Sequence, residues 1–355
     1  MAQETSRRRR LAGVSLGFLA AFGLVELGLR LAFPPHRFRD PNSDCYWVLE
    51  LEERVRKHDP SEFVDMELDE ELGWSPKRSF DSGVGLTTNS RGLRGTPEFS
   101  DSKNPGRMRI AVFGDSFTYG LALRDEETFC ARMRAALAPA EVLNFGVNGY
   151  GTDQQYLYWR ARGLRTRPDV VLLAFYLPDF HRNAFSVRGA PKPRLDLAAG
   201  EFRVQNVPVK SPKDFVRERV SECRSPSRLG DLLGWAWREN IRSTDEQAFQ
   251  AKADLARAIL QHFDSEVRAS GARFALIAIP HHEFRRYEDH ERILHVLEEA
   301  AKAAGFPVLD LTDPLQEPER ADPARSLYDK GHWNAAGSAE ATTRIVEFLK
   351  ANGVL

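Results

Sequence analysis

Short apolar runs alternate with amphipathic helical patterns from Met108 toward the C-terminus. Five of these runs read as strands, near residues 109–113, 141–145, 169–175, 273–279 and 306–310. Such an alternation is typical of a parallel sheet covered by helices on both faces, because each crossover helix packs back on the sheet. The sequence therefore predicts an α/β fold: a three-layer α/β/α sandwich around a doubly wound, mainly five-stranded parallel sheet.

A serine follows the first of these strands. Residues 114–120 read GDSFTYG, and the glycine ends the strand, so Ser116 falls on a strand-to-helix turn with a free backbone amide. Doubly wound sheets bind ligands at the carboxyl ends of their strands. Ser116 is therefore a candidate nucleophile, although a serine at this place can also serve only as a helix cap.

A second string, DKGHWN at residues 329–334, can supply the base. Asp329 and His332 lie three apart in a loop before a helical pattern over 334–350, and this spacing lets one carboxylate orient one imidazole. Ser116, His332 and Asp329 are thus a candidate catalytic triad, in which His332 takes the proton of Ser116. Alone, Ser116 could be only a helix cap and Asp329 only a loop carboxylate. The prediction of a triad therefore depends on the presence of both motifs, GDSFTYG and DKGHWN, in one chain.

Three other histidines offer alternatives. His281 and His282 follow the fourth strand and are rival bases or metal ligands, although adjacent histidines are commonly solvated loop residues. His181 follows the third strand and is a candidate for substrate contact. The three cysteines lack the spacing of a structural zinc motif. The expected chemistry needs no metal ion and no organic cofactor, and we predict none.

A third string, LNFGVNGYGTDQ, ends another strand in glycine-rich backbone. With it, the chain resembles the GDSL-type esterases of the SGNH hydrolase superfamily over roughly residues 70–351. Ser116 matches the nucleophile of that family and Gly149 the glycine of its second block. Asp329 and His332 match its closing D-x-x-H motif. The resemblance implies a flavodoxin-like SGNH hydrolase fold and a carboxylesterase-like hydrolase.

The third block of the family pattern is not matched. Members usually read G-x-N-D after the third strand, and the asparagine side chain helps to hold the oxyanion. This chain reads YLPD, so that either Pro178 stands in that place or one residue is missing. Proline has neither a side-chain donor nor a backbone N–H. Loss of one oxyanion donor typically costs about 2.7–4 kcal/mol of transition-state stabilisation. The amides of Ser116 and Gly149 remain as donors. Asn183, or second to it Asn148, is a candidate substitute.

An apolar run precedes the whole pattern. Residues 11–33 are almost wholly apolar and as a helix would span about 34 Å, enough to cross a bilayer. The arginines at 7–10 predict a cytoplasmic basic tail over residues 1–10 and an extracytoplasmic remainder. We therefore expect a single-pass cell-membrane protein, with a periplasmic domain if the source is Gram-negative. A cleaved signal peptide is the main alternative, but no convincing small-x-small cleavage site precedes Pro34.

Two charged residues interrupt the apolar run. Glu26 lies four residues before Arg30, so the two side chains can pair on one helix face near the outer interface. A membrane proton relay is the alternative, but one isolated carboxylate makes a poor relay. We therefore expect a local ion pair.

The remaining chain divides into an extension and a domain. Residues 34–107 are rich in turn signals and charge and read as an N-terminal extension. The hydrolase-like domain would cover 108–351, with an insertion at 181–243 over the active-site face. Specificity for a substrate would reside in the extension and the insertion. Neither carries a recognisable ligand motif, so the sequence does not identify the substrate.

Cysteine usage and charge set further limits. Cys130 lies in a helical pattern and is expected to be buried. Cys45 and Cys223 both lie in the exported part, where a disulfide is permitted but not indicated. The formal net charge is −1, and the N-terminal arginines are explained by the anchor, so we expect no nucleic acid partner.

These features predict an exported, membrane-tethered serine esterase. Its partners would be the lipid bilayer and an acylated small molecule, glycan or lipid. Two other functions remain open. One is O-acyl transfer to an envelope polysaccharide by the same triad. The other is a binding or scaffold protein that kept the fold while Pro178 impaired its oxyanion site.

Overall fold

The computed structural model describes residues 2–57, 64–101, 103–240, 246–283, 287, 289–321 and 326–355. The chain forms two compact units, each built from two separate stretches. Met1–Pro60 and Ser211–Asp245 make up the helical unit. Ser61–Lys210 and Glu246–Leu355 make up the sheet unit. The predicted extension (34–107) and the predicted insertion (181–243) are each divided between the two units.

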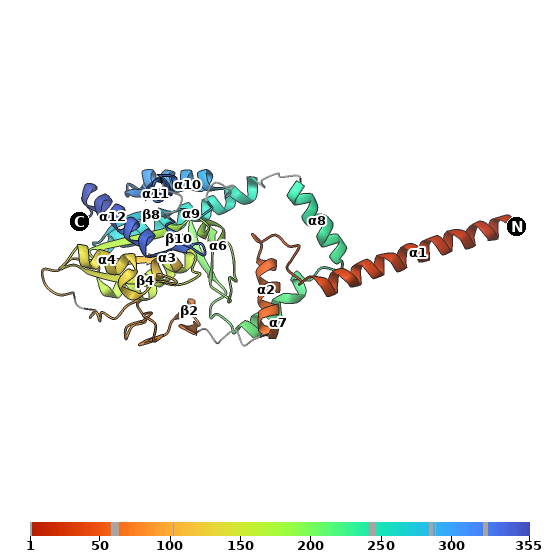
Figure 1. Ribbon diagram of the computed structural model, residues 1–355, viewed down its shortest axis with the longest axis horizontal. Helices are drawn as coiled ribbons and strands as arrows, with labels where there is room; N and C mark the ends of the chain where they lie inside the picture. The colour runs from red at the N-terminus through yellow and green to blue at the C-terminus, as the bar shows by residue number, and fades with distance from the viewer. Residues whose placement is uncertain are drawn as a thin grey trace. The chain divides into compact units, whose positions relative to one another are not determined.

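The sheet unit is built on a five-stranded parallel sheet with the strand order β4-β3-β5-β8-β9 (Figure 1). Its strands are β3 (Arg109–Gly114), β4 (Glu141–Gly146), β5 (Val170–Tyr176), β8 (Arg273–Ile279) and β9 (Val308–Asp310). β3, β4 and β5 are buried at every residue, as expected where helices cover both faces. The predicted doubly wound parallel sheet is confirmed.

Helices form a layer on each face of the sheet. One face packs against α5 (Thr152–Tyr158), α9 (Glu246–Ala269) and α10 (His290–Ala304) through a large apolar core. The other packs against α4 (Phe129–Ala136) and α12 (Ala335–Ala351) through a second core. Cys130 on α4 is 1% exposed and belongs to the second core, as predicted.

Shorter elements complete the sheet unit. They are the antiparallel pairs β1 (Met66–Asp69) with β2 (Gly73–Pro76), β6 (Arg194–Ala198) with β7 (Glu201–Gln205), and β10 (Tyr328–Asp329) with β11 (His332–Trp333). The remaining turns and helices are α3 (Ser116–Tyr119), η1 (Asp125–Glu127), η2 (Trp159–Gly163), η3 (Leu164–Thr166), α6 (Asp179–Arg182) and α11 (Thr312–Ala321). β10 with β11 carries Asp329 and His332, α3 carries Ser116, Gly149 follows β4, and Asn183 follows α6.

Order in the sheet explains where a site can form. β3 has β4 on one side and β5 on the other, and Gly114 at its end pairs with both Gly146 and Ala174. The carboxyl ends of β4, β3 and β5 therefore lie side by side. The connection from β3 leads to its neighbour on one side, and the connection from β4 leads to the strand on the other side of β3. In doubly wound sheets this switch point is where ligands bind.

The helical unit contains α1 (Ala2–Ala32), α2 (Asp44–Lys57), α7 (Pro212–Cys223) and α8 (Arg228–Asn240). A disulfide between Cys45 and Cys223 joins α2 to α7, with a Cα–Cα distance of 5.0 Å. The sequence left this pairing open, and the structure contains it.

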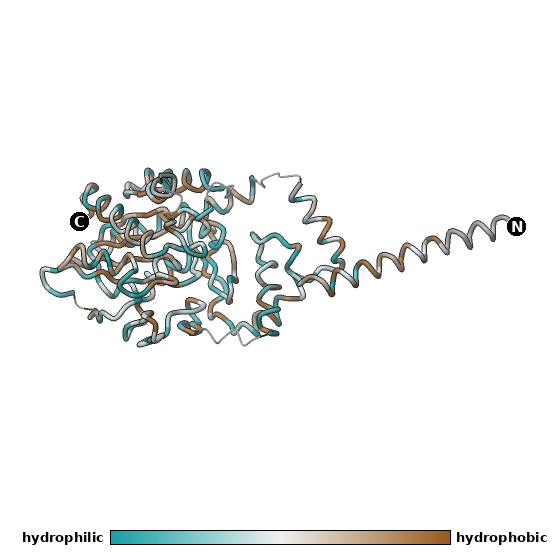
Figure 2. Tube along the Cα trace, viewed as in Figure 1, coloured by the Kyte–Doolittle hydropathy of each residue, from teal (hydrophilic) through white to brown (hydrophobic). Residues whose placement is uncertain are grey.

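Helix α1 contains the predicted apolar segment. Among the described residues, Gly13–Ala32 is long and apolar enough to cross a membrane, and Figure 2 shows hydrophobic residues along it. Arg30 Nε donates to Glu26 Oε1 at 2.7 Å, so the predicted ion pair forms. The side chains of the arginines at 7–10 lie outside the described residues.

Candidate active site

The turn after β3 presents the candidate nucleophile. Asp115 caps α3, because its Oδ1 accepts the Phe117 amide at 3.0 Å. Gly114 is required before it, since a Cβ there would lie 2.0 Å from Thr118 Oγ1. The result is a sharp, fully packed strand-to-helix turn that carries Ser116 at the carboxyl edge of the sheet, with the serine 4% exposed.

A histidine faces this serine. Ser116 Oγ and His332 Nε2 lie 2.8 Å apart, although their positions in the chain differ by 216 residues. His332 also hydrogen-bonds to the Lys330 backbone carbonyl. Because Nε2 faces Ser116, we assign this second bond to Nδ1–H, which leaves Nε2 as the acceptor that a general base needs.

The histidine is held by a tight hairpin and by ring packing. Lys330 and Gly331 both have positive φ, at 47° and 83°, as a two-residue turn between antiparallel strands requires. The Phe117 ring lies against the imidazole with centroids 5.0 Å apart. The base is therefore oriented from both its edge and its face.

The surroundings of His332 favour its neutral form. Burial lowers the pKa of His332 below its usual value, and the positive charge of Arg182 and the nearby His282 act in the same direction. Asp115 and the Lys330 carbonyl oppose this effect. A neutral imidazole beside a serine hydroxyl can take its proton at neutral pH.

Asp329 lies close to this pair but does not bond to it. In the β10–β11 hairpin Asp329 is directly opposite His332, so their side chains share one face. The Asp329 side chain is exposed, and among the described residues no hydrogen bond or ion pair joins it to His332. The structure thus brings Ser116 and His332 together, and the role of Asp329 stays a prediction.

A buried charge network lies behind the nucleophile, and sequence reasoning missed it. Asp115 is fully buried, with its Oδ2 3.3 Å from Ser116 Oγ. Arg182 Nη1 donates to the same oxygen at 3.1 Å and to Asp179 Oδ1 at 2.7 Å. Burial raises the pKa of Asp179 well above its usual range, and Arg182 acts against that rise. The i,i+3 spacing of Asp179 and Arg182 after β5 was the available signal.

Two backbone amides can form the core of an oxyanion hole. Gly149 has φ +82°, a conformation that favours glycine. The Trp74 indole donates to the Asn148 carbonyl at 2.9 Å and fixes the peptide before it. Among the described residues, the amides of Ser116 and Gly149 have no hydrogen-bond acceptor. Both remain available to a ligand.

Pro178 and Asn183, from the unmatched third block, lie at the two ends of α6. Pro178 begins α6, and its carbonyl accepts the His181 amide at 3.1 Å. Asn183 ends α6 and is fully buried, with its Oδ1 accepting the Asp153 amide at 3.1 Å. Its Nδ2 has no partner among the described residues. The Asn148 side chain is exposed. Whether either amide serves an oxyanion stays a prediction.

The rival histidines lie at the same edge of the sheet. His281 stacks on Tyr287 with ring centroids 5.4 Å apart, and burial lowers its pKa. His282 packs against the Gly331 turn, where a Cβ would lie 3.2 Å from its ring. His181 bridges Lys252 and Asp289, at 3.3 and 3.4 Å. Across the described part of the chain, no group of three or more His, Cys, Asp or Glu residues could hold a metal ion.

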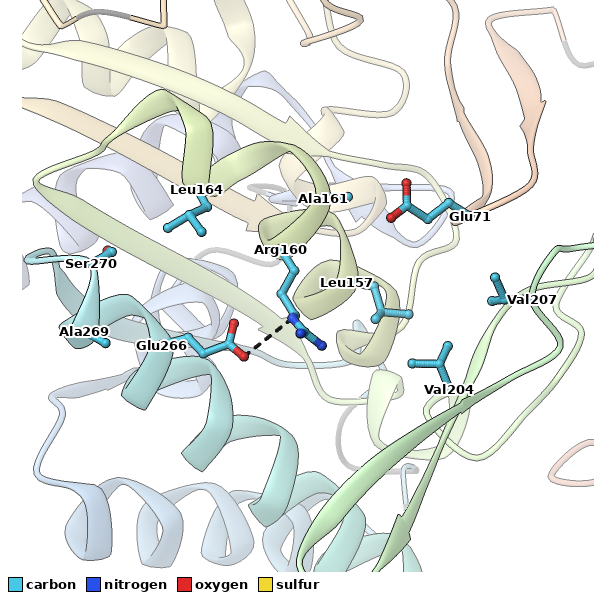
Figure 3. Close-up of a pocket in the computed structure, with 10 residues that line it drawn as sticks. All are labelled: Glu71, Leu157, Arg160, Ala161, Leu164, Val204, Val207, Glu266, Ala269 and Ser270. Atoms are coloured by element: carbon cyan, nitrogen blue, oxygen red, sulfur yellow. Dashed lines mark ion pairs between the residues drawn. The ribbon is translucent and has the colours of Figure 1, made fainter.

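A separate cavity of about 760 Å³ opens elsewhere in the sheet unit (Figure 3). An ion pair between Arg160 and Glu266, at 3.5 Å, crosses it, and Leu157 and Val204 are among its apolar walls. Neither Ser116 nor His332 lines it. This cavity therefore does not enclose the candidate site.

The α/β/α sandwich presents a serine–histidine pair where β3 ends, an arrangement that fits an SGNH-type hydrolase fold. A family model described as the GDSL-like Lipase/Acylhydrolase family matches residues 112–339, more than half of the chain. The chain belongs to this GDSL-like family. The matched range includes Ser116, Gly149, Asp329 and His332.

Solved structures resemble the chain at low sequence identity. TesA is 13% identical and covers 69% of this chain and 99% of its own, with a TM-score of 0.42. A catalytic mutant of an acetylxylan esterase from Geobacillus stearothermophilus is 14% identical and covers 70% of this chain and 95% of its own, with a TM-score of 0.42. No curated protein matches the chain.

Proposed function

We propose that the protein is an exported, membrane-tethered serine esterase that removes acyl groups, acetyl above all, from a carbohydrate or lipid. The observation that carries the proposal is the 2.8 Å contact between Ser116 Oγ and His332 Nε2 at the sheet edge, within a chain of the GDSL-like family. The apolar helix Gly13–Ala32 supports the tether. An envelope location favours acylated glycans and lipids as substrates.

The proposed reaction has two steps. His332 takes the proton of Ser116 as its Oγ attacks the ester carbonyl, and the alcohol leaves with that proton, so an acyl-serine forms. Water then gives a proton to His332 and attacks the acyl carbon, which releases the acid and restores the serine. The lowered pKa of His332 supports its role as the base in both steps.

The negative charge on the carbonyl oxygen needs donors in both steps. The amides of Ser116 and Gly149, which have no acceptor in the described part of the chain, are proposed to provide two donors. Asn183 is the proposed substitute for the third, because its buried Nδ2 lacks a partner in the described chain. Asp329 is proposed as the acid of the triad, with the Lys330 carbonyl already in a position to orient His332.

The buried charges near Ser116 also bear on the reaction. The Ser116 hydroxyl has two acceptors within reach, His332 Nε2 at 2.8 Å and Asp115 Oδ2 at 3.3 Å. Arg182 donates a hydrogen bond to this Asp115 oxygen, and its positive charge offsets the negative charge of the carboxylate. The hydroxyl proton is thereby directed to His332, and less negative charge opposes the alkoxide that forms.

Labelling with a fluorophosphonate tests the proposal directly. The full chain in detergent should be labelled, and Ser116→Ala should not, whereas Ser338→Ala, which removes a buried hydroxyl on α12, should keep the label. Absence of label from the unaltered chain would favour the binding or scaffold function. Product analysis with an acetylated glycan, with and without an acceptor sugar, then separates hydrolysis from acyl transfer.

A further inference from the structure

Helix α8 starts on the apolar helix α1, with which it shares the helical unit. Glu26 on α1 accepts the first amides of α8, from Arg228 at 2.8 Å and from Leu229 at 3.1 Å. Ser227 Oγ donates to the same carboxylate at 3.1 Å. A carboxylate at this position satisfies helix amides that would otherwise lack acceptors. The beginning of α8 is therefore tied to one level of α1.

That level lies near the outer end of the apolar segment. Glu26 precedes Ala32, the end of α1, by about 9 Å of helix at 1.5 Å per residue. The segment Gly13–Ala32 has 20 residues, close to the thickness of a bilayer core. Helices that lie in the membrane interface bury their apolar face about 5–10 Å into the boundary between head groups and acyl chains. Glu26 therefore places the start of α8 at the depth of such a helix.

The polar face of α8 is occupied by the segment that follows α1. Arg228 Nη1 donates to the Pro35 carbonyl at 2.6 Å, and Arg238 Nη2 donates to the Phe38 carbonyl at 2.9 Å. Asp231 pairs with Arg39 at 3.5 Å. Within the described part of the chain, these contacts leave the opposite face of the helix uncovered.

That opposite face is apolar and exposed. Leu233 and Trp237, four residues apart on one face, are 62% and 67% exposed. Neighbouring exposed apolar side chains of this size suit contact with lipid or another protein, and the position of α8 beside the apolar helix decides between the two. Figure 1 shows α8 turned across the direction of α1, and Figure 2 shows hydrophobic residues along both helices.

Aromatic rings surround the same junction. Phe38 lies between Phe33 and Trp235, with ring centroids 5.2 and 6.0 Å away. Tryptophan and other aromatic residues are enriched at the level of lipid head groups, because their rings are apolar but tolerate polar surroundings. The occupant that fits the exposed face is therefore the bilayer that α1 enters.

We propose that α8 lies in the outer membrane interface with Leu233 and Trp237 among the lipids, as a second membrane contact beside α1. This proposal rests on the membrane anchor in the proposed function and goes beyond it. A single spanning helix allows the exported part to rotate and tilt freely. A second contact at the interface restricts the orientation of the helical unit at the membrane surface.

Depth-dependent quenching tests this contact in the full chain. The protein is reconstituted in phosphatidylcholine vesicles with an environment-sensitive fluorophore on Trp237→Cys, and in a second preparation on Leu233→Cys. Lipids with a nitroxide at acyl carbon 5 should quench both labels at least threefold more than a label on Lys302→Cys. Lys302 is an exposed residue of α10 in the sheet unit and serves as the matched control. Equal quenching at all three positions would overturn the proposal.

A carbonate wash of the same vesicles tests the membrane anchor α1 separately from the interfacial position of α8. Protein that stays with the vesicles while the α8 labels remain unquenched would retain the anchor and eliminate the interfacial helix. Protein that leaves the vesicles would eliminate both. Quenched α8 labels on retained protein are the expected result.

Discussion

The two units of the chain are stabilised by different means. The sheet unit buries whole apolar strands. It also contains buried ion pairs, such as those of Arg182 with Asp115 and Asp179. The helical unit has no strand among its described residues, and a disulfide and the bonds to Glu26 connect its helices. Reactive groups thus belong to the unit in which a parallel sheet fixes the backbone.

This difference makes the two units unequal under substitution. Removing one partner of a buried ion pair leaves an uncompensated charge and is strongly destabilising. Removing a bond between exposed helices costs less and acts locally. We expect substitutions near Ser116 to slow the reaction strongly, and substitutions in the helical unit to leave its rate almost unchanged.

The largest effect should come from Ser116→Ala. Loss of the nucleophile should lower kcat for a short acyl ester by about 10⁴-fold or more, while the thermal unfolding temperature changes little. The control is Ser338→Ala on α12, which should keep near-normal kcat. A Ser116→Ala protein that still hydrolyses the ester would place the chemistry elsewhere, with His281 and His282 as the first residues to examine.

Arg182→Met should have the second-largest effect. We expect kcat to fall about a hundredfold and the free energy of unfolding to fall by about 3–5 kcal/mol. Asp115 and Asp179 would then lack their buried cation. Because the positive charge of Arg182 helps to lower the pKa of His332, the acid limb of kcat/KM should move to higher pH. Asp179→Asn leaves Arg182 paired with Asp115 and is the matched control. If the acid limb of the kcat/KM profile stayed at the same pH in Arg182→Met, Arg182 would have only a structural role.

The pH profile of the unaltered protein should fall on the acid side about tenfold per pH unit. His332 acts as a base only when neutral, and its pKa is lowered, so the neutral form persists below the usual titration range of a histidine. Activity should therefore be lost only below about pH 6.5, as the pH passes the lowered pKa. A midpoint above pH 7 in kcat/KM measurements would contradict this environment for His332.

Asp329→Ala should lower kcat by about tenfold or more, because Asp329 is the proposed acid of the triad, but by less than the full loss because the Lys330 carbonyl would still orient His332. A fall below about tenfold would contradict the triad role of Asp329. Loss of a triad acid that truly orients the base costs about 10⁴-fold. The carboxylate is exposed and shares a hairpin face with His332. Kinetics of Asp329→Ala beside His332→Ala would thus distinguish a serine–histidine pair from a full triad.

The smallest effect on catalysis should come from Cys45→Ser with Cys223→Ser. Loss of the disulfide should weaken the helical unit by about 2–5 kcal/mol, seen as faster proteolysis of α2 and α7. Ester hydrolysis should stay within about twofold, because both cysteines lie outside the sheet unit. A large loss of kcat would mean that the two units do not act separately.

Local patterns in the sequence predicted the sheet but not its polar interior. Each predicted strand agrees with an observed one to within two residues, because buried parallel strands are continuous apolar runs. Short motifs at strand and helix ends also predicted that Ser116 and His332 would lie together, and the two side chains are 2.8 Å apart. Arg182 and Asp115 are 67 positions apart, and no periodic signal joins them. The helical unit likewise pairs segments that are far apart in the chain, such as 44–57 with 212–223.

Asp329 illustrates a different difficulty. The D-x-x-H spacing predicts that a carboxylate can reach the imidazole, but spacing alone does not specify the turn between them. In the turn itself, Lys330 and Gly331 have positive φ and the Lys330 carbonyl hydrogen-bonds to the imidazole, while the orienting role of Asp329 stays a prediction. Backbone groups have no sequence signature, so an orienting carbonyl cannot be predicted from residue types.

The disulfide also bears on how the protein could be released from a membrane. Cys45 and Cys223 are 178 positions apart, and β3, β4 and β5 all lie in the loop that they close, whereas β8 and β9 lie beyond it. A protease that cuts once inside this loop leaves the anchor helix covalently joined to the rest. Shedding of the whole sheet unit would therefore require a single cut between α1 and Cys45, a cut between Cys45 and the sheet unit together with reduction of the disulfide, or three cuts, two within the loop and one after Cys223.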